Sequence, residues 1–154
     1  MELLKQLIAV KGASGDESRI KEFVLNYVKA EQGNWTTQPV VIEGEEWQDQ
    51  LILVFGEPRT AIYAHIDTIG YTVGYERELI KIGGPAAIDG MKLVGENANG
   101  DELEVELNVY EDEDGGAHYE YLGEEELARG TVLTFKPDFR ETEKFVQTPY
   151  LDNR

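Results

Sequence analysis

The most informative part of the sequence reads AIYAHIDTIG and covers residues 61–70. Its first four residues form an apolar run, which is typical of a strand buried on both faces of a sheet. His65 and Asp67 follow directly, and residues two apart in a strand project to the same face. Because open α/β sheets bind ligands at the carboxyl ends of their strands, we expect these two side chains to lie together at such an edge.

A histidine and a carboxylate at this spacing can serve a metal ion, because a metal-bound imidazole needs an acceptor for its other ring nitrogen. Spacing alone does not decide between this role and a structural histidine at a strand end. The sequence has no cysteine, which excludes disulfides, thiolate metal sites and cysteine nucleophiles. Any metal would therefore be held by histidine and carboxylates. The one other histidine, His118, follows Gly115 and Gly116 and is expected to be an exposed loop residue.

The residues before this stretch predict two helices. Apolar residues at helical spacing predict a short helix over residues 3–8 and a stronger helix over residues 20–28. Ser14 stands three residues before Glu17, which is the spacing of a capping box, and capping accounts for this serine without a catalytic role. The dipeptide Gly33-Asn34 is expected to end the second helix.

Two further strands are predicted between the helices and residues 61–70. The β-branched residues 40–42 predict one strand, and the continuous apolar run at residues 51–55 predicts a second strand buried on both faces. Two helices followed by buried strands indicate the opening of an α/β layer.

Beyond Gly70 the pattern becomes that of an all-β module. Apolar and polar residues alternate over residues 103–109, which is typical of a half-buried antiparallel strand. Asn99-Gly100 is a hairpin-turn dipeptide, residues 111–116 form an acidic turn, and residues 132–135 predict a last strand. We therefore expect a small β module, inserted into the α/β domain.

The charge and the N-terminus restrict the partners and the compartment. The formal net charge is −17, with 31 acidic and 14 basic residues. Nucleic acids and anionic membrane surfaces are not expected as partners, because both repel a field of this sign. The first residues lack the pattern of a signal peptide and no long apolar run follows, so the cytoplasm is the expected location.

Four stretches, in this order, resemble the glutamyl and deblocking aminopeptidases, the forty-second metallopeptidase family within the di-zinc exopeptidases. They are GASGDE at residues 12–17, AHIDTIGY at residues 64–71, GTVLTF at residues 130–135 and LDNR at residues 151–154. The last stretch is similar to the family's Leu-Asp-Asp-Arg. Two positions depart from the family pattern: Thr68 stands where glutamate is frequent, and Asn153 replaces the second aspartate.

The resemblance implies roles for three residues. His65 would bind one metal ion, Asp67 would orient His65 from behind, and Asp152 would bridge two divalent ions, which would be zinc, cobalt or manganese. It also implies an α/β sandwich catalytic domain interrupted by a barrel-like β domain that serves homo-oligomer assembly. Residues 1–70 would then begin the catalytic domain, residues 71–148 would form the insert, and residues 149–154 would return to the catalytic domain.

The expected activity is removal of N-terminal residues from peptides by two-metal hydrolysis. No residue of the chain matches the family's general base or its remaining ligands, so the chain alone is expected to be inactive. Two alternatives stay open. The first is a non-catalytic assembly or binding module, and the second is a related di-zinc deacylase or carboxypeptidase. The β character of the insert argues against the second, because those relatives usually carry an α+β lid.

Overall fold

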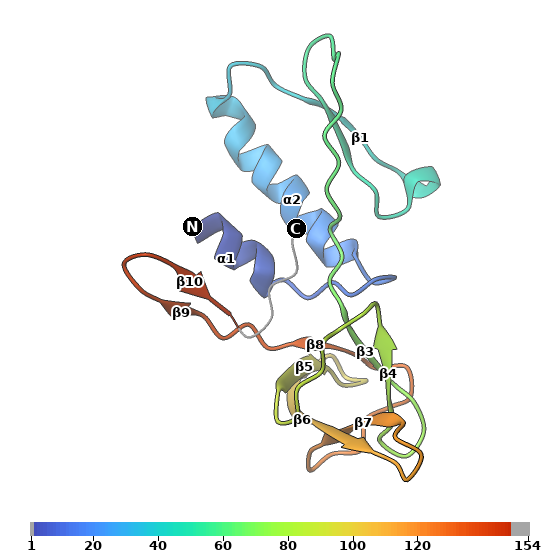
Figure 1. Ribbon diagram of the computed structural model, residues 1–154. Coiled ribbons are helices and arrows are strands. Elements are labelled where there is room, and N and C mark those ends of the chain that lie inside the picture. Colours follow the sequence, from blue (N-terminus) through green and yellow to red (C-terminus); the bar gives the residue numbers. More distant parts are fainter. Residues whose placement is uncertain (1, 149–154) are drawn as a thin grey trace.

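The computed structural model describes residues 2–148 and consists mostly of β-sheet, with two α-helices at the N-terminal end (Figure 1). Helix α1 spans Glu2–Ala9 and buries none of its residues, whereas α2 spans Ser18–Glu31 and buries Ile20 and Val28. A 3₁₀ turn, η1 at Gln32–Asn34, continues the second helix. Both predicted helices are confirmed.

The predicted ends of α2 are wrong at both termini. Glu17 occupies the N-cap position, and its carboxylate accepts a hydrogen bond from the backbone N–H of Gly15 at 2.7 Å. Ser14 is therefore not the cap, because its hydroxyl is directed elsewhere in the fold. Gly33 lies within η1 and does not take the positive φ angle that a terminating glycine uses.

Strands β1 (Val40–Ile42) and β2 (Ile52–Val54) form a two-stranded antiparallel sheet, joined through the 3₁₀ turn η2 at Glu45–Trp47. The first of the two predicted strands is confirmed. The second is shorter than predicted and is only partly covered, since Ile52 and the adjoining Phe55 are exposed. The expectation of a strand buried on both faces is wrong here, because no other strand or helix of residues 2–148 encloses the pair.

The apolar run at residues 61–64 forms no strand at all. Ile62 is 95% exposed and Tyr63 is 91% exposed. An apolar run becomes a buried strand only where neighbouring strands and a covering layer are present, and among residues 2–148 this segment has neither. Residues 2–148 therefore comprise two helices and a barrel-like sheet, and they do not confirm the α/β sandwich that the sequence predicts.

The main sheet has six antiparallel strands in the order β4-β3-β8-β5-β6-β7. Its two edges approach each other: Glu78 forms an antiparallel bridge with Glu120, and the N–H of Tyr121 donates to the carbonyl of Arg77 at 3.1 Å. The sheet is thus nearly closed into a barrel (Figure 1). Its strands are β3 (Gly70–Val73), β4 (Leu79–Ile82), β5 (Lys92–Glu96), β6 (Glu102–Glu111), β7 (Ala117–Leu122) and β8 (Val132–Phe135).

The barrel interior is the main hydrophobic core. The strands predicted at residues 103–109 and 132–135 are confirmed, and the apolar residues of the first face inward as their alternation predicts. The hydroxyl of Tyr121, buried in this core, accepts a hydrogen bond from the N–H of Leu127 at 2.8 Å. The buried core residues are Tyr71, Val73, Leu79, Leu93, Val105, Leu107, Tyr121, Leu127 and Leu133.

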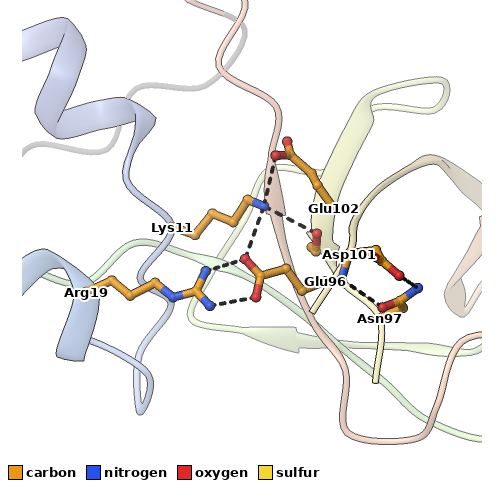
Figure 2. Close-up of polar contacts among 7 residues, drawn as sticks. Lys11, Arg19, Glu96, Asn97, Asp101 and Glu102 are labelled. Atoms are coloured by element: carbon orange, nitrogen blue, oxygen red, sulfur yellow. Dashed lines mark hydrogen bonds and ion pairs between the residues drawn. The ribbon is translucent and has the colours of Figure 1, made fainter. Parts of the chain in front are cut away.

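Charged contacts join the helical end of the chain to the barrel. Arg19 on α2 forms a two-pronged ion pair with Glu96 on β5, and Lys11 lies 3.7 Å from both Glu96 and Glu102 (Figure 2). The Lys11 ammonium group also donates to the carbonyl of Gly95 at 3.3 Å. A further hairpin, β9 (Arg140–Glu141) with β10 (Val146–Gln147), contacts α1 through the Lys5–Glu141 ion pair.

Candidate functional site

His65 and Asp67 meet, as their spacing predicts. The Nδ1 atom of His65 lies 3.0 Å from the backbone carbonyl oxygen of Asp67 and 3.2 Å from its carboxylate Oδ1. A carbonyl oxygen and a carboxylate oxygen can only accept hydrogen bonds, so Nδ1 must carry the hydrogen and donate it. The neutral ring is therefore held in the tautomer whose Nε2 is the nitrogen suited to bind a metal.

Asp67 is held from its other side by Ser14. The Ser14 hydroxyl donates to Oδ2 of Asp67, while Oδ1 faces the imidazole. Each carboxylate oxygen thus has its own partner, which fixes both the position of the group and the rotation of its plane. Sequence analysis assigned Ser14 to helix capping and missed this contact, because the two residues are 53 positions apart and no local pattern connects them.

The same contacts act on the protonation of Asp67. The Ser14 hydroxyl holds the pKa of the Asp67 carboxyl below its ordinary value. A hydrogen bond from the backbone N–H of Asp67 to its own carboxylate and the nearby His65 ring act in the same direction, whereas partial burial opposes them. Asp67 is consequently a carboxylate at neutral pH, as an acceptor for the imidazole N–H must be.

The loop that carries Ser14 is paired with the segment that carries Asp67. The N–H of Thr68 donates to the carbonyl of Gly12 at 2.7 Å, and the N–H of Ser14 donates to the carbonyl of Thr68 at 3.3 Å. Ala13, which lies between Gly12 and Ser14, forms a parallel bridge with Thr68 and is buried. This short ladder sets the separation of the two backbones at the point where the side chains meet.

The described residues do not form a metal site by themselves. Among residues 2–148, no group of three or more histidine, aspartate or glutamate side chains is placed to hold a metal ion together. His65 with Asp67 behind it fits one ligand and its supporting acceptor. The predicted second ligand, Asp152, lies outside the described residues, as does the return to the catalytic domain predicted from residue 149.

His118 lies on strand β7 and has partners of its own. Its Nε2 is 2.7 Å from Oδ2 of Asp112, and its ring stacks on Tyr110 with ring centres 5.3 Å apart. The prediction that it is exposed is confirmed, and the prediction that it lies in a loop is wrong. Strand β7 begins at Ala117 and includes His118, because the chain pairs with β6 directly after the glycine turn.

No α-helix of residues 2–148 has the length and apolar character that crossing a membrane requires.

The chain is similar in structure to an aminopeptidase from the archaeon Desulfurococcus kamchatkensis, with a TM-score of 0.64 and 17% sequence identity. The similarity covers 92% of this chain and 44% of the archaeal protein, so the chain spans less than half the length of that aminopeptidase. Comparison with protein-family models gives no match, and comparison with curated protein sequences gives none either. At this identity the structural similarity shows that the chain has an aminopeptidase-like fold.

Proposed function

We propose that the chain is the N-terminal portion of a metal-dependent aminopeptidase that removes N-terminal residues from peptides. The observation that carries the proposal is the similarity to an archaeal aminopeptidase over 92% of the chain. The contact between His65 and Asp67 supports it independently, since a histidine with a carboxylate on its far nitrogen is a recurrent metal-binding arrangement. His65 would bind the metal through Nε2, and Asp67 would keep the ring in place.

A metal pair, when bound, supplies polarisation of the scissile carbonyl and a hydroxide nucleophile at neutral pH. Histidine and carboxylate ligands without thiolates suit zinc, cobalt or manganese. Asp152 would be the bridging ligand, and the general base together with the remaining ligands would come from residues beyond Arg154. On this proposal residues 1–70 belong to the catalytic domain and residues 71–148 to an inserted β domain.

The simplest test is to determine the coding sequence that follows Arg154. The proposal expects an open frame that encodes a general-base glutamate and further histidine and carboxylate ligands. A stop codon directly after Arg154 would contradict it. For the complete product, aminoacyl nitroanilide hydrolysis with added zinc, cobalt or manganese should be abolished by His65→Ala and retained by His118→Ala.

The 154-residue chain alone should show no turnover in the same assay. A catalytic zinc usually takes three protein ligands, and the residues assigned above provide two. Loss of a general base alone costs about 10²–10⁴-fold in rate. Metal-dependent turnover by this chain that is sensitive to His65→Ala would show that its active site is complete within 154 residues.

A non-catalytic assembly module is the second candidate. It would hold if the reading frame that follows Arg154 encoded none of the remaining ligands. In either case we propose that the β domain promotes self-association, because it exposes Tyr75, Ile80 and Ile88 to solvent. Removal of residues 71–148 from the complete protein should lower the number of subunits per particle, measured as mass by light scattering, and an unchanged number of subunits would contradict the assembly role.

A further inference from the structure

Ser14 lies on a loop that is anchored at both ends and in the middle. Lys11 before it contacts the carbonyl of Gly95, and Arg19 after it is paired with Glu96, so both ends are attached to strand β5 (Figure 2). Between these anchors the backbone of residues 12–14 pairs with Thr68. The hydroxyl is thus presented to Asp67 by a fixed segment.

We infer that Ser14 is a positioning residue for His65 and acts through Asp67. Its hydroxyl fixes Oδ2 of Asp67, so that Oδ1 stays on Nδ1 of the imidazole and, together with the backbone carbonyl of Asp67, holds the ring in the Nδ1–H tautomer. Without the hydroxyl, the carboxylate is able to rotate about its side-chain torsions and turn toward water. The consequence for metal binding rests on the proposed function, whereas the effect on the tautomer does not.

Helix capping does not account for the serine. The N-cap of α2 is Glu17, and the helix begins at Ser18, four residues after Ser14. The hydroxyl also lies on the carboxylate oxygen that the imidazole does not use. The arrangement is a chain of three side chains, from Ser14 through Asp67 to His65, that ends on the candidate metal ligand.

The second histidine provides an internal control of matched exposure. The side chains of His65 and His118 are each 46% exposed, and each ring has an aspartate partner. His118 uses Nε2 for that contact, and Asp112 accepts it. The two rings should therefore hold opposite neutral tautomers, Nδ1–H in His65 and Nε2–H in His118.

The experiment is long-range proton–nitrogen NMR of the histidine rings in the metal-free, ¹⁵N-labelled chain at about pH 8.5, where an ordinary imidazole is neutral. His118→Gln assigns the signals. Ser14→Val and Ser14→Thr have the same shape and differ in carrying a methyl group or a hydroxyl. In Ser14→Val the two ring-nitrogen signals of His65 should move toward each other as the tautomers mix, while His118 stays unchanged. Ser14→Thr should keep the wild-type pattern.

The same pattern of His65 ring-nitrogen signals in Ser14→Val and Ser14→Thr would overturn the inference. Titration of these samples with cobalt(II) then tests the proposed metal site separately from the positioning role of Ser14. Loss of a side chain that supports a metal ligand without touching the metal costs about 10–100-fold in metal affinity. We therefore expect Ser14→Val to require about tenfold more cobalt than wild type to broaden the His65 signals. A tautomer change without any cobalt effect on His65 would refute the metal site and leave the positioning role standing.

Discussion

Replacement of Gly70 by alanine should destabilise the barrel next to the candidate site. Gly70 is buried at the start of β3, three residues after Asp67, and pairs with Ile82 on one side and Thr134 on the other. A Cβ atom built there would lie 2.3 Å from the carbonyl oxygen of Leu133, whereas ordinary contact begins at 3.4 Å. Strands β3 and β8 would therefore have to separate locally by about 1 Å.

The magnitude follows from that separation. Forcing extra volume into a packed interior costs about 1–3 kcal/mol, and a hydrogen bond stretched by 1 Å is lost, at about 0.5–1.5 kcal/mol. Alanine offsets part of this cost, about 0.4–1 kcal/mol, because it restricts the unfolded chain more than glycine does. We expect a net loss of about 0.5–4 kcal/mol, centred on about 2 kcal/mol, in the free energy of unfolding.

Stability is measured by urea unfolding followed by far-ultraviolet circular dichroism, which reports on the secondary structure of the whole chain, the sheet included. Both tryptophans, Trp35 and Trp47, lie before the barrel, so their fluorescence reports on the N-terminal part separately and tests whether unfolding is two-state. Gly84→Ala is the matched control, because its Cβ would meet nothing within 4 Å. That variant should match wild type or gain up to about 1 kcal/mol. Equal stability of the Gly70 and Gly84 variants would refute the reasoning.

Three further changes test the core, the junction and the exposed segment. Leu107→Ala should cost about 2–5 kcal/mol by urea unfolding, because it opens a cavity in the fully buried barrel core. Arg19→Met should cost about 0.2–1 kcal/mol near pH 7. Arg19 lowers the pKa of Glu96, so this contribution is present above the ordinary glutamate pKa of about 4.3 and is lost as pH falls through the lowered value. Combined Ile62→Ser and Tyr63→Ser should change stability by less than about 0.5 kcal/mol and should reduce binding of a hydrophobic dye.

Matched variants give each of these predictions a control. Leu122→Ala removes the same side chain from an exposed position of the same barrel, and a loss as large as that of Leu107→Ala would contradict the cavity argument. Lys29→Met removes a charge from the same helix as Arg19. If the free energy of unfolding of Arg19→Met and Lys29→Met depended on pH in the same way, the ion pair of Arg19 with Glu96 would not be the cause of that dependence. A loss above 1 kcal/mol in the double serine variant would show that residues 62 and 63 are buried in solution.

The spacing of apolar residues correctly predicted those helices and strands whose packing partners lie close to them in sequence. Alternation over residues 103–109 identified β6 because its partners β5 and β7 adjoin it in sequence, and helical spacing identified α2 through its buried Ile20 and Val28. The run at residues 61–64 failed as a strand, since the same pattern needs neighbours that residues 2–148 do not provide.

The sequence predicted two of the three contacting side chains of the candidate site, His65 and Asp67, and did not predict Ser14. A spacing of two predicted the contact of His65 with Asp67, and the structure contains it, although these residues do not follow the strand from which it was predicted. Ser14 could not be found in this way, because its partner is distant in sequence and a capping motif offered a sufficient local explanation. Asp152 was reached through resemblance, and its place relative to His65 stays a prediction.

The proposed function depends on His65 as a metal ligand. Cobalt(II) titration of the intact chain tests this role through the NMR signals of the two histidine rings. His118 sits beside an acidic turn, residues 111–114, so unspecific attraction of cations favours His118. We predict that the His65 signals broaden at lower cobalt concentrations than the His118 signals and that Asp67→Asn reduces this difference. Broadening of His118 first, or of both rings together, would contradict the account.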